Sequence, residues 1–392
     1  MRILILNADY PRFLAWLYRA HAGLEHAAHA DQMKARNASL FGSSDFYSRR
    51  FTGLGHPAAD VHVNNRFLQS AWAREHGMAR EAEALVEAPT QQAVPGWLER
   101  AVAPFKPLLR PLARRIGLSP RLDPASEKIL LAQIEAFKPD LVLNQDVFHV
   151  DTALMRRIKG IGKPVLVGQV GIEPSRGVDW SVYDLMISQL ARIVQSFRAA
   201  GVRAEVSHLA FEPRLLDALP PAPPRDIDVS FVGSLSADHR QRIALLEAVA
   251  ARYDLKIWGA ISRSVPASSP LHRCFQGEVW GAEMYQTLRR AKITLNSHID
   301  IAGREAGNVR LFEATGVGAF LLTDFKDNLH TLFEPDREVA AWRSIDDCLA
   351  AIARFLEDAE GRAAVAAAGQ KRTLSRHTYE NRAREILGLV GA

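Results

Sequence analysis

The 392-residue chain is 48% hydrophobic and 24% charged, a composition that excludes a disordered or fibrous protein. Its length exceeds one ordinary core and predicts two domains of about 150–200 residues each. The only cysteines, Cys274 and Cys348, argue against a disulfide framework and against a cysteine-based metal site. The first apolar run ends at Asn7 without a signal-peptide core, and no stretch approaches the roughly 18 apolar residues of a spanning helix. We therefore expect a cytoplasmic protein.

The positive charge is concentrated in residues 96–121. This segment holds six basic side chains against Glu99 alone, an excess of five that equals the formal net charge of the whole chain, +5. Apolar residues lie among the charges, so one interpretation is peripheral contact with an anionic membrane face or an acidic acceptor. The simpler interpretation is a solvated helical insert, and three prolines argue against one clean amphipathic helix. No nucleic-acid-binding module is recognisable, so nucleic acid is not an expected partner.

Short apolar, β-branched runs alternate with helical patterns through the first half of the chain. This alternation predicts βαβ units and a parallel sheet. The predicted strands are 2–6, 141–144, 165–168 and 185–188, and the predicted helices include 126–137 and 190–200.

A proline-rich stretch, 219–226, predicts a stiff interdomain connection. The alternation then restarts. The predicted strands are 227–232, 254–258, 293–296 and 319–323, and the predicted helices are 239–252, 281–291, 308–316, 344–356 and 359–373. The sequence thus predicts an α/β protein of two doubly wound domains, 1–218 and 227–376, that face one another.

In such sheets, ligands bind beyond the carboxyl ends of the strands. In the first half these positions offer Asn144, Asp146 and His149, of which Asp146 or His149 would bind acceptor hydroxyls or orient a sugar. The alternative is that an Asp or His in such a loop caps a helix. Weaker acceptor-side candidates are Asp9, Tyr10 and Glu173.

The richest segment is 305–318, where two glutamates flank a helix start. Gly307-Asn308 offers an N-cap, and free N–H groups at that helix start would attract an anion. Arg310, in the first turn, would reach the same phosphates. Glu313, on the same face, would accept from both ribose hydroxyls, and Glu305 would accept from the hydroxyls of a transferred sugar. The alternative is a surface helix with an ordinary Arg–Glu pair.

The run Asn308-Val-Arg-Leu-Phe-Glu-Ala-Thr-Gly-Val-Gly-Ala-Phe-Leu-Leu-Thr-Asp324 resembles the donor-binding signature of group 1 family glycosyltransferases, in the branch of CgeB-like spore-maturation proteins. Residues 332–335 and 376–384 are similar to closing motifs of that branch. The resemblance covers about 228–387, and residues 1–6 and 45–48 are similar less specifically. It implies the GT-B architecture, with two Rossmann-like domains across a cleft. It also implies that the donor binds in the C-terminal domain and the acceptor mainly in the N-terminal one, and that a helix in 377–392 crosses back.

The resemblance implies a set of donor-site residues in this sequence. They are Gly233, Ser234, Arg240, Trp258, Gly259, Asn296, His298, Gly307, Asn308, Val309, Arg310 and Glu313. The chain departs from the family's Gly-Arg…Lys form, because Ser234 replaces the Arg and Arg240 or Arg242 must replace the Lys. For Trp258 and His298 a structural role is the alternative.

These residues predict a metal-independent glycosyltransferase that uses a nucleotide-diphosphate sugar, needs no cofactor and acts on an unidentified acceptor. The resemblance implies retention, for which Arg240, Arg310, Glu305, Asp146 and His149 are the catalytic candidates. Asp226-Ile-Asp228 has the form of a metal-binding motif, but it opens a predicted strand at the wrong end for a donor. The alternatives are a nucleotide-sugar epimerase or hydrolase on the same fold, and an inactive nucleotide-sugar-binding protein.

Overall fold

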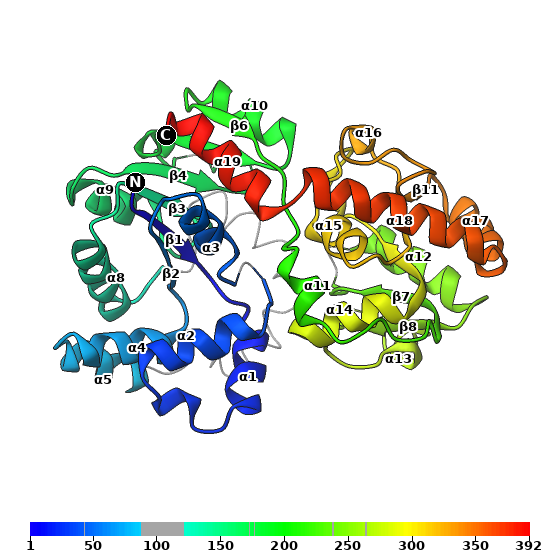
Figure 1. Cartoon of the computed structure of the whole chain (residues 1–392), viewed down its shortest axis with the longest axis horizontal. Coiled ribbons are helices and arrows are strands. Elements are labelled where there is room, and N and C mark those ends of the chain that lie inside the picture. The colour runs from blue at the N-terminus through cyan, green and yellow to red at the C-terminus, as the bar shows by residue number, and fades with distance from the viewer. Residues whose placement is uncertain (43, 88–120, 172, 176, 237–238, 263–264) are drawn as a thin grey trace. The chain divides into compact units, whose positions relative to one another are not determined.

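The computed structural model describes the chain except residues 43, 88–120, 172, 176, 237–238 and 263–264 (Figure 1). It divides into two compact units. The first unit contains residues 1–207 and 383–392, and the second contains residues 208–382. The proline-rich stretch 219–226 therefore lies inside the second unit, and the end of helix α19 (Tyr379–Val390) belongs to the first.

The first unit is built on a six-stranded parallel sheet in the order β2-β1-β3-β4-β5-β6. Strands β1, β3 and β5 are buried along their whole length, as expected for a parallel sheet covered on both faces. The strands are β1 (Ile3–Asn7), β2 (Ala58–His62), β3 (Leu141–Asn144), β4 (Val165–Gln169), β5 (Leu185–Ser188) and β6 (Ala204–Val206). Four of the six were predicted. β2 and β6 were not, because one is rich in alanine and polar residues and the other has only three residues.

Two helices of the first unit have aspartate N-caps, because Asp123 and Asp151 each accept from two backbone N–H groups at a helix start. These helices are α1 (Pro11–Ala20), α2 (His29–Ala38), α3 (Phe46–Gly53), α4 (Arg66–Glu75), α5 (Ala79–Glu87), α8 (Pro124–Phe137), α9 (Thr152–Gly160) and α10 (Ala191–Ala199). The basic segment 96–121 lies outside the described residues except for Arg121, which forms an ion pair with Asp151 at 2.9 Å.

The second unit holds a five-stranded parallel sheet in the order β11-β10-β9-β7-β8. Its strands are β7 (Ile227–Val232), β8 (Leu255–Trp258), β9 (Ala291–Asn296), β10 (Leu321–Asp324) and β11 (Ala340–Trp342). Its helices are α11 (Arg214–Ala218), α12 (Arg240–Ala250), α13 (Leu271–Cys274), α14 (Gly281–Arg290), α15 (Val309–Gly316), α16 (Leu329–Leu332), α17 (Ile345–Glu357) and α18 (Ala359–Arg376), followed by the start of α19. The predicted α/β class with doubly wound parallel sheets is confirmed.

Each sheet has one point where the strand order changes direction. In the first unit β2 and β3 lie on opposite sides of β1, and in the second unit β8 and β9 lie on opposite sides of β7. Connections diverge at the carboxyl ends of these central strands and leave a crevice there, which is where open α/β sheets bind ligands. The topology therefore predicts ligand sites at residues 7–9 and 144–146 in the first unit and at residues 233–234 and 296–298 in the second.

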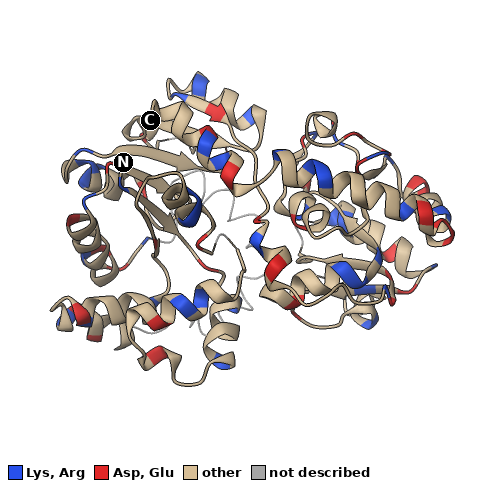
Figure 2. Cartoon of the chain, viewed as in Figure 1, with Lys and Arg blue, Asp and Glu red and all other residues tan. Residues whose placement is uncertain are grey.

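Charged residues lie mostly on helices and loops, and strands β1, β3, β4 and β5 carry none (Figure 2). The centre of the first unit's sheet is thus an apolar support for polar strand ends. Among the described residues, no helix combines the length and the apolar character needed to cross a bilayer.

Candidate functional site

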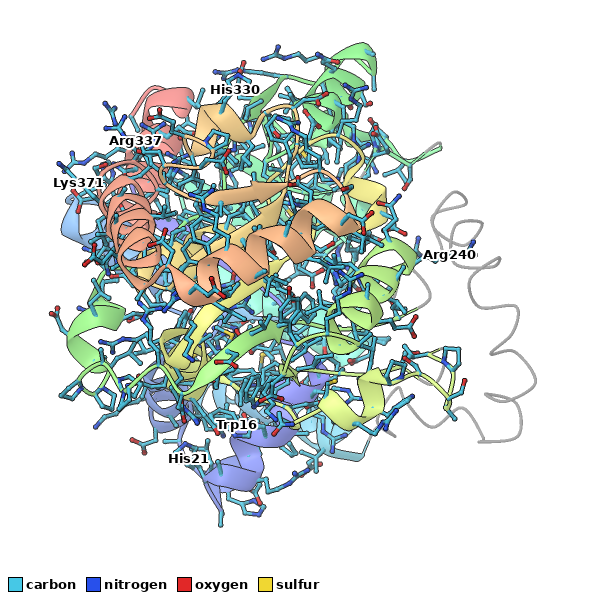
Figure 3. The ribbon with its side chains drawn as sticks, turned by 90° about the vertical axis from the view of Figure 1, so that its right-hand side faces the viewer. Trp16, His21, Arg240, His330, Arg337 and Lys371 are labelled. Atoms are coloured by element: carbon cyan, nitrogen blue, oxygen red, sulfur yellow. The ribbon has the colours of Figure 1, made fainter. Side chains whose placement is uncertain are left out.

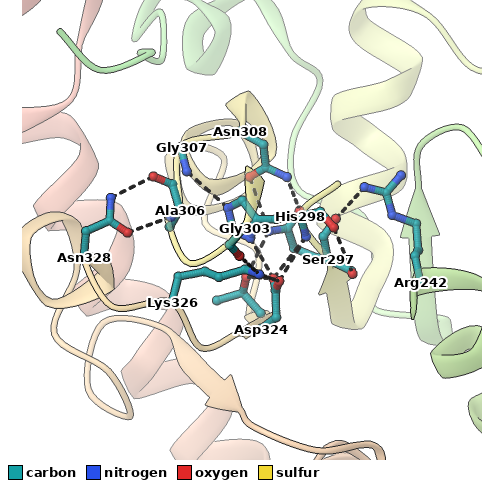
Figure 4. Close-up of polar contacts among 12 residues, drawn as sticks. Arg242, Ser297, His298, Gly303, Ala306, Gly307, Asn308, Asp324, Lys326 and Asn328 are labelled. Carbon is teal, nitrogen blue, oxygen red and sulfur yellow. Dashed lines mark hydrogen bonds and ion pairs between the residues drawn. The ribbon is translucent and has the colours of Figure 1, made fainter. Parts of the chain in front are cut away.

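Arg242 joins the ends of β7 and β9 at the change of strand direction in the second unit. Its guanidinium donates to the carbonyl of Ser234 at 3.0 Å and to that of Ser297 at 2.6 Å (Figure 4). Burial lowers the pKa of Arg242 to about 10, although Asp324 and Asp300 oppose this shift. Because its donors are used on two backbone carbonyls, Arg242 holds the site together.

The ends of β7 and β8 approach so closely that only glycine fits. Gly259 has a φ of 134°, and a Cβ there would overlap the carbonyl oxygen of Gly233. The N–H of Gly233 in turn donates to the carbonyl of Trp258 at 2.8 Å. The predicted residues Gly233, Trp258 and Gly259 therefore lie together at these strand ends.

His298 is 3% exposed and occupies the end of β9 next to the end of β10. Its Nδ1 lies 2.7 Å from Oδ1 of Asp324, and its Nε2 lies 3.2 Å from the backbone nitrogen of Gly307 (Figure 4). Because a backbone N–H can only donate, we assign the neutral tautomer with the proton on Nδ1. Burial raises the pKa of Asp324, but its hydrogen bonds from the ring and the backbone N–H of His298 and the charge of Lys326 outweigh burial and hold that pKa below its usual value.

Side chains from other elements also hold the main chain of the loop 303–308. Lys326 Nζ donates to the carbonyl of Gly303 at 2.7 Å. The Asn328 amide accepts from the N–H of Ala306 at 2.6 Å and donates to its carbonyl at 2.9 Å. Figure 4 shows these contacts converging on the loop from the region after β10. Side chains from outside the loop thus fix its path by binding its main-chain atoms.

Helix α15 starts with backbone donors that have no acceptor. Asn308 is the N-cap residue, but its side chain makes no capping hydrogen bond. Instead its Nδ2 donates to Oδ1 of Asn296 at 2.7 Å. Within the described part of the chain, no acceptor is found for the N–H groups of Val309 and Arg310. Such a helix start favours an anion through both its N–H groups and the helix dipole.

Arg310 and Glu313 lie on one face of α15, as their spacing predicts, and form an ion pair at 2.8 Å. The Arg310 side chain is 14% exposed and that of Glu313 is 9% exposed. The Tyr285 hydroxyl donates to Glu313 at 3.4 Å, and burial, with the adjacent Glu313 charge, raises the pKa of Tyr285. A ligand hydroxyl that bonds to Glu313 would therefore replace part of the contact between Glu313 and Arg310.

The remaining predicted donor-site residues are Arg240, Ser234 and Glu305. Arg240 is exposed at the start of α12 (Figure 3), and its N–H donates to Asp300 at 3.2 Å, close to the loop 303–308 in sequence. Ser234 is exposed directly after β7, and Glu305 is half-buried within the loop.

The strand ends of the first unit hold a buried charge cluster. Asp9 is 6% exposed, and its carboxylate lies 2.5 Å from Nη2 of Arg36 and 3.1 Å from Nδ1 of His62. Burial raises the pKa of Asp9, but the charges and hydrogen bonds of His62 and Arg36 outweigh it and bring that pKa far below its usual value. Arg36 and His62 were not predicted as site residues, because a buried arginine in a polar helix gives no sequence pattern that distinguishes it from a solvated one.

The other strand-end polar residues of the first unit bond mostly to their own loop. Asn144 is buried, donates to the carbonyl of Val150 at 3.1 Å and contacts the Tyr183 hydroxyl at 2.8 Å. Asp146 accepts from the N–H of His149 at 3.3 Å and lies 2.6 Å from its Nδ1. Asp146 therefore holds a turn of its own loop and the His149 ring, whereas that ring remains one-quarter exposed.

Glu173 and Tyr10 lie nearer the surface. Glu173 forms an ion pair with Arg192, and Tyr10 is 65% exposed and lies 6.1 Å from the Phe41 ring between centroids.

Two cavities, of about 550 and 470 Å³, lie in the first unit near the amino ends of β2 and β4. None of the predicted donor-site, acceptor-side or catalytic residues lines either cavity. Within the described ranges, no group of three His, Cys, Asp or Glu residues is arranged to hold a metal ion.

Residues 240–388 match a protein-family model described as glycosyl transferase-like. HepE from Anabaena, solved with UDP-glucose, is 14% identical and superposes with a TM-score of 0.58 over 100% of this chain and 99% of its own. A glycosyltransferase from Rickettsia africae ESF-5 is 9% identical, with a TM-score of 0.58 over 99% of this chain and 97% of its own. The chain has the GT-B fold. No curated protein matches it in sequence.

Proposed function

We propose that this GT-B protein is a group 1 glycosyltransferase of the CgeB-like branch, which moves a sugar from a nucleotide-diphosphate sugar to an acceptor. One observation carries the proposal. A loop whose main chain is held by His298, Lys326 and Asn328 leads into a helix start with N–H groups that lack acceptors. That helix also carries Arg310 and Glu313. Support comes from the family match over 240–388 and from the fold shared with HepE, which was solved with UDP and with UDP-glucose.

In this proposal the helix start binds the diphosphate. The N–H groups of Val309 and Arg310 and the guanidinium of Arg310 face its negative charge, with Arg240 contributing from α12. Glu313 accepts from the ribose hydroxyls in exchange for part of its contact with Arg310, and Glu305 accepts from the sugar. Gly233, Ser234 and Gly259 let the backbone approach the nucleotide. The donors are held before the reaction begins, so they stabilise charge without reorganising.

The reaction we propose retains configuration by same-face substitution. The bond between the anomeric carbon and the diphosphate oxygen breaks, and the acceptor oxygen bonds to that carbon on the same face. The proton of the acceptor hydroxyl passes to the departing diphosphate. Negative charge therefore grows on the phosphate, where the α15 N–H groups and Arg310 stabilise it. His149 is proposed to orient acceptor hydroxyls, and Asp146 to hold the His149 ring in place.

We propose that transfer proceeds without a metal ion, since N–H groups and guanidinium groups supply the positive charge. Treatment with EDTA should leave the rate unchanged. Activity that disappears with EDTA and returns with manganese would contradict this part of the proposal.

The first test is a thermal-shift panel of UDP, GDP, ADP and their sugars. A ligand at 100 times its dissociation constant stabilises the folded protein by about 2.7 kcal/mol. At least one nucleoside diphosphate should raise the melting temperature, and no shift with any of them would reject the proposal. Rapid consumption of the donor alone would favour the epimerase or hydrolase alternative.

A further inference from the structure

The backbone N–H of Gly307 is bonded to a side chain from another strand. It donates to Nε2 of His298 at 3.2 Å, while Nδ1 of the same ring faces Asp324 at 2.7 Å. Asp324 also accepts from the backbone N–H of His298, with distances of 3.1 and 3.2 Å to its two oxygens. Both ring nitrogens are therefore held, and the ring contacts the main chain at Gly307, directly before the N-cap of α15.

We infer that His298 is a positioning residue for diphosphate binding. By accepting from Gly307, it turns that N–H inward and sets the direction in which the chain enters α15. The N–H groups of Val309 and Arg310 then stay in the orientation that an anion requires. Asp324 acts one step further away, because it fixes the tautomer that leaves Nε2 as an acceptor. This inference rests on the proposed function and adds a residue that has no contact with the ligand.

Two amide substitutions separate the two nitrogens of the ring. In His298→Gln, the amide oxygen replaces Nε2 and can still accept from Gly307. In His298→Asn, the shorter amide replaces Nδ1, keeps a donor for Asp324 and leaves the Gly307 N–H without an acceptor. His330→Asn, at an exposed histidine of α16 (Figure 3), is the matched control.

The binding of UDP and of uridine to each variant is measured by calorimetry. We expect His298→Asn to weaken UDP binding by about 10- to 100-fold, the range found when a supporting hydrogen-bond partner is removed. Uridine, which has no phosphate, should bind the variant as it binds the wild type. His298→Gln should recover most of the loss, and His330→Asn should behave as wild type. In turnover assays the loss should appear mainly in the KM for the donor.

Equal UDP affinity in wild type and His298→Asn would overturn the inference and leave the proposed function standing. An equal loss for UDP and uridine would also overturn it, because this pattern indicates a general structural role. If no nucleoside diphosphate binds the wild type, the proposed function fails and the inference fails with it.

Should His298→Asn not fold, amide hydrogen exchange in the wild-type protein tests the same contact. The Gly307 amide should exchange much more slowly than the Val309 amide, which has no acceptor. Equal exchange rates would overturn the inference.

Discussion

The two units share a topology but use the ends of their central strands differently. In the first unit, the polar groups after β1 and β2 neutralise one another, since Asp9 pairs with Arg36 and His62 below the surface. In the second unit, the polar side chains after β9 and β10 bind main-chain atoms of a neighbouring loop. Side chains that hold the loop fix the direction in which the next N–H groups, those of Val309 and Arg310, face a ligand, whereas paired charges satisfy only themselves. The comparison supports an anion site in the second unit.

Loss of Arg36 should give the largest effect and act on stability. Arg36→Ala leaves the Asp9 carboxylate buried without its guanidinium, which costs about 3–5 kcal/mol when a buried pair is broken from one side. Urea denaturation at neutral pH measures the change. Arg19→Ala, an exposed position in α1, is the control and should stay within about 0.5 kcal/mol. Similar changes in the free energy of unfolding for both variants would show that the pair of Asp9 and Arg36 does not stabilise the fold.

Loss of Arg310 should act on transfer. Arg310→Gln keeps a polar side chain but removes the charge, and kcat/KM should fall about 10²- to 10³-fold, as when one charge-stabilising donor is removed. Arg310→Lys should also be impaired, because an ammonium cannot reproduce the planar guanidinium.

The matched control for Arg310 is Arg337→Gln, an exposed position (Figure 3) that should transfer at the wild-type rate. Unaffected transfer in Arg310→Gln would remove Arg310 from the proposed mechanism.

Gly259→Ala tests the close approach of β7 and β8. The backbone conformation at this position costs a non-glycine residue about 1–3 kcal/mol, and the added Cβ also meets the Gly233 carbonyl. Gly277→Ala is a matched control, because its φ is also positive (103°) but no atom lies within 4 Å of an added Cβ. Melting temperatures should fall in both variants and fall further in Gly259→Ala. Equal losses would show that the contact with Gly233 has no effect.

The smallest expected effect is a change in pH dependence. Burial raises the pKa of Asp60 to about 6, so the folded state keeps a proton that the unfolded chain releases above about pH 4. Asp60 therefore makes the protein less stable as pH rises from about 4 to about 6. Asp9 acts in the opposite direction, because its lowered pKa gives stability that is lost as pH falls below about 4.

Asp60→Asn should remove the loss of stability between about pH 4 and about pH 6. Plotted against pH from 4 to 8, the melting temperature of this variant should stay level or rise. Asp31→Asn, exposed in α2, should leave the wild-type profile unchanged. An identical profile in Asp60→Asn and wild type would contradict a raised pKa.

Strands could be predicted from the sequence where a run of apolar residues is long enough to show a pattern. Strands β7 and β5 were predicted to the residue, whereas β11, with three residues, carries no periodicity. In the candidate site, the strand-end rule and the resemblance pointed to Gly259, His298 and Asn308, which the structure places at strand ends and at the start of α15.

The resemblance included Asp324 as the last residue of the signature but gave it no role, and neither the rule nor the resemblance pointed to Asn328. Their partners lie 26 and 22 positions away in the sequence, and only the pairing of β9 with β10 brings the first of these pairs together. Such contacts depend on strand register, which local patterns do not contain.

The way in which the loop 303–308 is held has a consequence for engineering. Its main chain is attached at Gly303, Ala306 and Gly307 to side chains that lie outside the loop. Replacing Arg304 or Glu305 therefore alters the groups presented at this surface while the path of the polypeptide stays the same. In the proposed function Glu305 contacts the transferred sugar, so libraries at these two positions are the variants to screen for a changed choice of sugar.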